Sequence, residues 1–348
     1  MNHSISNVEV YFMTEYIYKS IIKRYIESYR KECMLTRRAM QKVDGILKSF
    51  DKFLIDKNID TIEINNETFE EWVNSFKATC SESTIYIKRA QIVSLLQYMS
   101  SVGVKCDVPR NTKFKPSSYV PYIFTEDEMI KSFSIADEWR DKSLKPESAL
   151  MAMPLLLRLL YSTGMRVSEA INILNKDIDF DQRTIRITKT KNGCERISPI
   201  NDTLLTCMLQ YKKFRDELPE LHIKDKESHF LVNHHGFALN KETILFRFHQ
   251  ITKKAGIIGN NTKNGTRIHD LRHTACIHVM MKLVREGYDL YNCLPAISAY
   301  MGHLSIFSTE KYLRFTRNMF PELLKMTKTV STPINDLLDN AFNFTEDE

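Results

Sequence analysis

The chain has 348 residues, of which 43% are hydrophobic and 26% are charged, and it contains only 10 glycines and 10 prolines. This balance excludes disordered, collagen-like and low-complexity chains, and the length predicts a globular protein with two domains of ordinary size. The formal net charge is +6, yet the segment after Lys328 holds five acidic residues and no basic one. The rest of the chain is therefore more basic than the whole, which favours a polyanionic partner such as a nucleic acid.

The sequence carries no pattern of export or of a membrane anchor. Its apolar run at 151–157 ends at Arg158, and its first residues lack a basic start followed by an apolar stretch. The seven cysteines are odd in number, and none is spaced C-x-x-C from another. We therefore expect a cytoplasmic protein with no disulfide framework, no zinc module and no membrane partner.

The first third of the chain is predicted to form a small all-helical domain over residues 1–110. Apolar residues recur every three or four positions at 35–54 and again at 85–99, which is typical of amphipathic helices. Between these segments Thr68 stands three residues before Glu71. This is the spacing of a capping box, and it predicts that a helix opens at Thr68.

A connector is predicted at 111–123, because residues 107–122 contain three prolines and little periodicity. Thr125 and Glu128 then repeat the capping-box spacing and predict the first helix of a second domain, which we place at 124–330.

Further elements are expected along this second domain. They are helices at 154–161, 166–174, 241–255, 270–285 and 309–325, and paired strands at 184–188 and 196–200. The fold class is therefore mainly α with a small antiparallel sheet (α+β).

Three short motifs carry residues that could do chemistry. They are Ser-Thr-Gly-Met-Arg-Val-Ser-Glu at 162–169, His-Asp-Leu-Arg-His at 269–273, and Gly302-His303 with Tyr312 nine residues after the histidine. Each motif alone is a weak signal, because arginines at helix starts are mostly solvated and single tyrosines are mostly core residues. Two histidines at i and i+4 could hold a metal ion, but no third ligand is evident, so we expect no metal site.

Together, in this order and spacing, the motifs resemble those of the tyrosine recombinase (phage integrase) family, relatives of lambda integrase, Cre and the bacterial Xer proteins. The resemblance covers about residues 125–320. It implies a catalytic domain there, preceded by a helical, SAM-like core DNA-binding domain. It also implies a bacterial, DNA-associated enzyme that cleaves and rejoins specific sites in double-stranded DNA through a 3′-phosphotyrosine intermediate and a Holliday junction.

The resemblance assigns a role to each motif residue. Tyr312 is the expected nucleophile, and Arg166 with Arg272 is the expected clamp on the non-bridging phosphate oxygens. His269 and His303 are expected to donate hydrogen bonds or move protons. Lys191, in the turn between the strands, is the expected acid for the 5′-oxygen, with Lys189 as its rival. Two further residues, Glu169 and His273, are expected to orient the clamp, and no cofactor is implied.

Other consequences are also implied by the resemblance. The working form is expected to be a homotetramer on DNA, with possible accessory or directionality proteins. The chain between Arg272 and His303 is longer than in compact Xer-like members, and 286–295 looks like an inserted loop, which favours the recombinase of a mobile element. The acidic tail at 331–348 carries an apolar stripe at helical spacing, and it could dock on a neighbouring protomer or on its own domain.

Two alternative functions remain. One is a catalytically idle DNA-binding or bridging protein of the same fold, and the other is a type IB topoisomerase.

Overall fold

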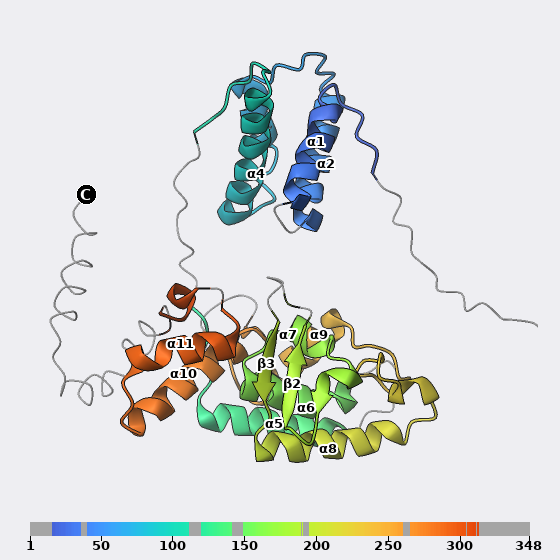
Figure 1. Cartoon of the computed structure of the whole chain (residues 1–348), viewed down its shortest axis with the longest axis vertical. Coiled ribbons are helices and arrows are strands. Elements are labelled where there is room, and N and C mark those ends of the chain that lie inside the picture. Colours follow the sequence, from blue (N-terminus) through green and yellow to red (C-terminus); the bar gives the residue numbers. More distant parts are fainter. Residues whose placement is uncertain are drawn as a thin grey trace, which may run out of the picture. The chain divides into compact units, whose positions relative to one another are not determined.

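The chain folds into two units that divide between Tyr119 and Val120. The structure is a computed structural model, and it describes residues 16–35, 40–110, 120–140, 149–188, 190, 195–259, 265–303, 305–310 and 312 (Figure 1). Each unit has its own buried hydrophobic core. Among the described residues, we find no helix that combines the length and the apolar character needed to cross a membrane.

The N-terminal unit consists of four helices in the described ranges, α1 (Lys23–Leu35), α2 (Met40–Asp56), α3 (Asn66–Asn74) and α4 (Glu82–Ser101). α2 packs against both α1 and α4. Its core includes Phe50 and Trp72, whose rings meet edge to face with centroids 5.2 Å apart. The buried Asp51 carboxylate accepts hydrogen bonds from the backbone N–H groups of Lys19 and Ser20 at 3.2 and 3.0 Å. This contact joins the chain entering α1 to the middle of α2.

The start of α3 corrects one prediction from the sequence. The helix begins at Asn66 rather than at Thr68, and Asn65 is its N-cap. The Asn65 side chain accepts a hydrogen bond from the Thr68 backbone N–H at 2.8 Å. Asparagine is a better N-cap than threonine, which explains why the helix starts earlier than the Thr68–Glu71 spacing suggests.

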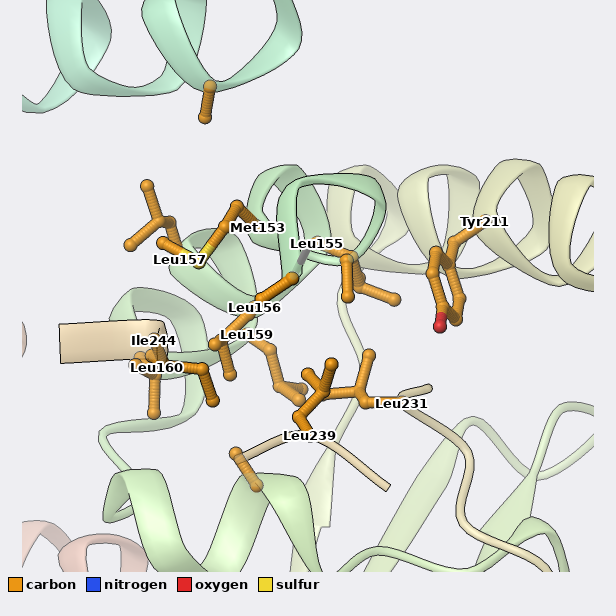
Figure 2. Packing of buried hydrophobic residues seen from close by; sticks show 14 of the residues in the cluster. Met153, Leu155, Leu156, Leu157, Leu159, Leu160, Tyr211, Leu231, Leu239 and Ile244 are labelled. Carbon is orange, nitrogen blue, oxygen red and sulfur yellow. The ribbon is translucent and has the colours of Figure 1, made fainter. Parts of the chain in front are cut away.

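The C-terminal unit is built around one central helix, α6 (Met153–Thr163). Its sequence is apolar around most of its circumference, as expected for a helix covered on several sides. α5 (Glu126–Arg140), α8 (Asp202–Asp216) and α10 (Asp270–Arg285) all pack against it. Figure 2 shows Leu156, Leu159 and Leu160 of α6 turned toward Leu239 and Ile244, the latter on α9 (Lys241–Lys254).

Two helix starts in this unit test the sequence predictions. The capping box at Thr125 is confirmed, because its backbone N–H donates to Glu128 at 2.8 Å and its side chain accepts from the Glu128 N–H at 3.2 Å. The stretch at 286–295, by contrast, is only partly a loop. α11 (Leu290–Met301) begins within it, where the Asp289 side chain accepts a hydrogen bond from the Asn292 N–H at 2.9 Å, and Pro295 lies inside the helix.

The sheet is small and antiparallel, in the order β1 (Ile178–Asp179), β2 (Thr184–Ile187) and β3 (Arg196–Pro199). Ile185 and Ile187 of β2 face the core. The helix expected over 166–174 is shorter, α7 (Val167–Ile171), and β1 was not predicted. The remaining elements are the 3-10 turns η1 (Ala149–Met151), η2 (Asn175–Asp177) and η3 (Leu221–Lys224). The predicted class, mainly helical with a small antiparallel sheet, is confirmed.

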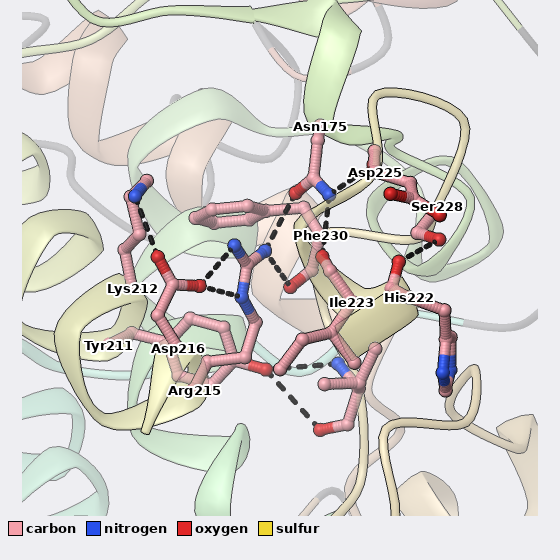
Figure 3. Close-up of polar contacts among 11 residues, drawn as sticks. Asn175, Tyr211, Lys212, Arg215, Asp216, His222, Ile223, Asp225, Ser228 and Phe230 are labelled. Carbon is pink, nitrogen blue, oxygen red and sulfur yellow. Dashed lines mark hydrogen bonds and ion pairs between the residues drawn. The ribbon is translucent and has the colours of Figure 1, made fainter. Parts of the chain in front are cut away.

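A buried arginine anchors the loops beside this sheet. Arg215, near the end of α8, is 2% exposed, and its guanidinium bonds to Asp216, to the Asn175 side chain and to the Phe230 carbonyl (Figure 3). The Asn175 amide in turn donates to the carbonyls of Ile223 and Asp225 at 2.8 and 2.7 Å. A buried charge is tolerated where its donors are paired in this way, so the network is structural and keeps α8 and η2 in register.

Candidate active site

The first motif forms a sharp corner between two helices. α6 ends at Gly164, whose φ of 59° is left-handed and suits glycine. Arg166 follows in extended conformation as the N-cap of α7. Its Nη1 donates to Glu169 Oε1 at 2.7 Å, and its backbone N–H donates to Glu169 Oε2 at 3.0 Å. The Arg166 guanidinium is therefore held by a residue of its own short helix.

Glu169 is shared between two arginines. Its side chain has no exposed surface, and Arg196 Nη2, at the start of β3, also donates to its Oε2 at 2.8 Å. Burial by itself would raise the pKa of Glu169, but the hydrogen bonds from Arg196 and from the Arg166 backbone outweigh burial and lower it. The sequence placed Arg196 only at the start of an expected strand, at 196–200. Its role beside Glu169 was missed, and no local spacing signals it.

Arg272 lies inside the unit rather than on its surface. It is 2% exposed, and its Nη1 donates to the Gly164 carbonyl at 2.5 Å while its Nη2 donates to the Met301 carbonyl. Both carbonyls lie at the C-terminal ends of helices, α6 and α11, where the helix dipole favours a cation. Burial, together with the charge of Arg166, lowers the pKa of Arg272 to about 10, so the guanidinium remains charged at neutral pH.

Tyr312 lies against two histidines. Its hydroxyl oxygen is 2.8 Å from His273 Nδ1, and its ring stacks on His303 with centroids 5.9 Å apart and an interplanar angle of 8°. His303 Nδ1 is 2.8 Å from Thr309 Oγ1. His269, the N-cap of α10, meets the His273 ring edge to face at 5.0 Å. The tyrosine is only 5% exposed, and burial raises its pKa above the ordinary value.

The structure brings together five of the six predicted catalytic residues and both supporting ones. The charges of Arg166 and Arg272 act on Tyr312 and on His303, which places these groups in one electrostatic neighbourhood. Of the two residues expected to orient the clamp, Glu169 bonds to Arg166, whereas the hydrogen bond of His273 goes to Tyr312. Lys191 and its rival Lys189 lie outside the described residues, as does the tail at 331–348. The helix expected at 309–325 lies mostly outside them.

Gly302 provides a test of how closely Arg196 is held. It ends α11 with a φ of 64°, and an added Cβ would lie 2.7 Å from Arg196 Nη1 and 2.8 Å from its Cζ. We expect Gly302→Ala to lower the free energy of unfolding by about 1–3 kcal/mol. The alanine would have to adopt a strained left-handed backbone conformation, and its Cβ would displace the Arg196 guanidinium. Urea denaturation followed by circular dichroism measures this loss.

Gly287→Ala is the matched control for this variant. Gly287 also has a left-handed φ, 84°, but no described atom lies within 4 Å of an added Cβ. It therefore carries the backbone strain without the clash, and we expect a clearly smaller loss. Equal losses at the two positions would mean that Arg196 moves aside at no cost.

The histidines predict how stability depends on pH. Burial and nearby arginines lower the pKa of His269 and of His303 to about 4, and of His273 to about 3, from 6.5. Between pH 6.5 and 4 the unfolded chain therefore binds more protons than the folded chain. Stability of the DNA-free protein is expected to fall as the pH falls through this window. Urea midpoints measured between pH 6.5 and 4 should fall less steeply with falling pH for His269→Gln than for the wild type. The same dependence of the midpoint on pH in both proteins would contradict the lowered pKa of His269.

Comparison with known proteins decides the family. The phage integrase family model matches residues 124–319, more than half of the chain. The chain belongs to the phage integrase family. This confirms the resemblance to tyrosine recombinases predicted from the three motifs.

Two curated relatives of this family member span most of its length. Tyrosine recombinase XerA of Pyrococcus horikoshii is 27% identical over 260 residues, which is 74% of this chain and 80% of the relative. Tyrosine recombinase XerC of Staphylococcus saprophyticus is 23% identical over 304 residues, or 86% of this chain and 93% of the relative.

Solved structures of other proteins share the fold of this phage integrase family member. The Tn1549 transposon integrase in complex with transposon right end DNA superposes with a TM-score of 0.60 and 19% identity, covering 83% of this chain and 94% of that one. The XerH recombinase in a post-cleavage complex with its difH substrate gives a TM-score of 0.57 at 18% identity, covering 81% and 78%.

Proposed function

We propose that this chain is a site-specific tyrosine recombinase that cleaves and rejoins double-stranded DNA through a 3′-phosphotyrosine intermediate. The observation that carries the proposal is the position of Tyr312, a buried tyrosine in the field of Arg166 and Arg272 and in contact with His273 and His303. A tyrosine that served only the core would need neither arginine.

The residues divide the cleavage step between them. Tyr312 Oη attacks the scissile phosphorus, the bond to the 5′-oxygen breaks, and the phosphotyrosine ester keeps the bond energy for religation. Arg166 and Arg272 hold the non-bridging oxygens as negative charge develops on them. His269 and His303 donate further hydrogen bonds, and Lys191 protonates the departing 5′-oxygen. The arginines supply the positive charge that metal ions supply in many nucleases, so cleavage is expected to proceed in EDTA.

The contacts around Arg166 and Arg272 support their assignment to the clamp. One guanidinium is fixed by Glu169 and the other by two helix-end carbonyls, so both are oriented before substrate arrives. Electrostatic stabilisation of a transition state depends on donors that need no reorganisation. Hydrogen bonds to described residues use two of the five Arg272 N–H donors, and the proposed clamp uses others.

Duplex DNA is the proposed partner, with a homotetramer as the working form. Two of the similar structures, the Tn1549 integrase and XerH, contain DNA, and a lambda integrase tetramer bound to a Holliday junction also shares the fold with a TM-score of 0.55. In the N-terminal unit, Lys48 and Lys52 of α2 line a surface hollow beside Ser75 and Phe76. We assign the domain predicted at residues 1–110, which lies within this unit, to core DNA binding, where lysines would neutralise backbone phosphates.

A role in a mobile element is the biological setting we propose, supported by the likeness to the Tn1549 transposon integrase. Integration, excision and transposition share the same strand exchange, and accessory or directionality proteins would select among them. The acidic tail is proposed to dock on a neighbouring protomer. Deletion of residues 333–348 should then prevent tetramer assembly on DNA, and unchanged assembly would argue for docking within one chain.

The first test is to trap covalent protein–DNA adducts from bacteria that express the chain and to sequence the attached DNA. A recombinase is expected to give adducts that cluster at one sequence. Adducts scattered without a motif, together with relaxation of supercoils by a monomer, would favour a type IB topoisomerase. DNA binding without adducts at the bound site would favour the catalytically idle protein.

A further inference from the structure

His273 makes a contact that its expected supporting role does not explain. It directly follows Arg272 on α10, yet its Nδ1 lies 2.8 Å from Tyr312 Oη, and the two ring centroids are 5.4 Å apart at 42°. The two residues are separated by 39 positions in the sequence. The packing of α10 against the segment that carries Tyr312 therefore brings a ring nitrogen to the hydroxyl of the proposed nucleophile.

A tyrosine in this position needs a proton acceptor. The phenol must lose its proton as the oxygen bonds to phosphorus, and burial makes that loss harder because it raises the pKa of Tyr312. With 5% of Tyr312 exposed, bulk water has little access to the hydroxyl. A general base must lie within about 2.6–3.2 Å of the proton that it takes, and His273 Nδ1 meets this condition.

The surroundings keep His273 neutral before DNA binds. Burial is the main cause, and together with nearby charges it lowers the pKa of His273 to about 3. The groups that face the ring are His269 at the N-cap of α10, Arg267 before this helix, Arg272 on it, and His303 after α11. A neutral imidazole can accept the phenolic proton at Nδ1 when its own proton is on Nε2. A bound phosphate would offset the positive charges around the ring and so stabilise the imidazolium that forms.

We propose that His273 is the general base of strand cleavage and accepts the Tyr312 proton at Nδ1; this inference rests on the proposed recombinase function. The bond from Tyr312 Oη to phosphorus forms while the bond from phosphorus to the 5′-oxygen breaks. The phenolic proton moves to His273, and the 5′-oxygen takes its proton from the separate acid, Lys191. In religation the 5′-hydroxyl attacks phosphorus and gives its proton back to Lys191, the bond from phosphorus to Tyr312 Oη breaks, and His273 returns its proton to the departing tyrosine.

The test is single-turnover cleavage by His273→Gln on the DNA recovered from wild-type adducts, at protein concentrations that saturate binding. Glutamine can still bond to the tyrosine but cannot take a proton at neutral pH, so cleavage is expected to slow by roughly 10²–10⁴-fold. The rate of the variant should increase with pH, because hydroxide must then remove the phenolic proton. A loss of placement alone would give no such increase.

A substrate with sulfur in place of the bridging 5′-oxygen separates the base from the acid. Thiolate leaves without protonation, so this substrate restores cleavage to a variant that lacks its acid but not to one that lacks its base. We expect the His273→Gln defect to persist on it and the Lys191→Ala defect to disappear. If the His273→Gln defect disappeared on this substrate, His273 would not be the base that takes the proton of Tyr312.

α10 also offers a matched control. His278 Nδ1 lies 2.7 Å from the hydroxyl of Tyr161, so the same kind of histidine–tyrosine pair joins α10 to α6. His278→Gln is expected to lose stability but to cleave within about threefold of the wild-type rate, since distant sites that share no partners act independently. A defect as large as that of His273→Gln would mean that both variants merely disturb α10.

A second measurement covers the case in which His273→Gln fails to fold. In protein labelled with ¹⁵N at histidine, the His273 Nδ1 resonance should report an unprotonated nitrogen that accepts a hydrogen bond, and Tyr312→Phe should shift it. A protonated Nδ1 would overturn the inference. Failure of the wild-type chain to form any adduct would overturn the proposed function itself, whereas wild-type adducts with an equally fast His273→Gln would overturn only the role of His273.

Discussion

Tyr312→Phe is expected to abolish covalent protein–DNA adducts completely while leaving DNA binding within a few-fold of the wild-type affinity. The variant lacks the oxygen that would bond to phosphorus, and no neighbouring group can replace it in a 3′-phosphotyrosine ester. Phenylalanine keeps the ring that stacks on His303 at 5.9 Å, so the fold should change little. Denaturing gels measure the adduct, and mobility shifts on the recovered DNA measure binding.

Tyr161→Phe is the control for the loss of a tyrosine hydroxyl. Tyr161 is half-buried, it bonds to a histidine Nδ1 as Tyr312 does, and burial raises its pKa as well. It lies in α6, and adduct formation should survive its replacement. Adducts that persist in Tyr312→Phe would show that another residue is the nucleophile, and mass spectrometry of the DNA-linked peptide would then identify it.

Arg166→Ala is expected to slow single-turnover cleavage by roughly 10²–10³-fold, the usual cost of one donor to a developing oxyanion. DNA binding should change only a few-fold, because other basic residues also contact the backbone. The Arg166 side chain is 21% exposed, and Glu169 retains Arg196 as a partner when Arg166 is removed. The variant should therefore fold, unlike Arg272→Ala, which would leave two buried carbonyls without their donor.

Arg158→Ala is the control matched in exposure and pairing. The Arg158 side chain is also 21% exposed and is paired with a carboxylate, that of Asp137, but it lies on α6 between α5 and α8. Cleavage by this variant should match that of the wild type. Equal losses of cleavage and of binding in Arg166→Ala would indicate that Arg166 is a DNA contact and not part of the clamp.

Local patterns in the sequence predicted most of the elements because their contacts span one helical turn. The Thr125–Glu128 capping box and the end of α6 at Gly164 both depend on residues within four positions. The errors were also local. Asn65, and not Thr68, is the N-cap of α3, and Asp289 is the N-cap of α11 inside a stretch interpreted as a loop.

Contacts between distant segments could not be read from spacing. The motifs predicted which residues belong to the site, but not that Arg272 donates to Gly164 and Met301, at separations of 108 and 29 positions. The bond from Arg196 to Glu169 spans 27 positions. Such contacts depend on how helices pack, and packing is set by side-chain volumes across the whole core rather than by any short pattern.

The sequence by itself determined the family, the fold class and the residues proposed for catalysis, because the three motifs, the helical periodicity and the turn glycines are local properties of the chain. Only the tertiary structure decided what each of these residues touches. It made Glu169 a carboxylate between two arginines and placed His273 on the Tyr312 hydroxyl. The physical reason is that α6, α10 and α11 converge through buried side chains, and only their convergence sets the distances on which the chemistry depends.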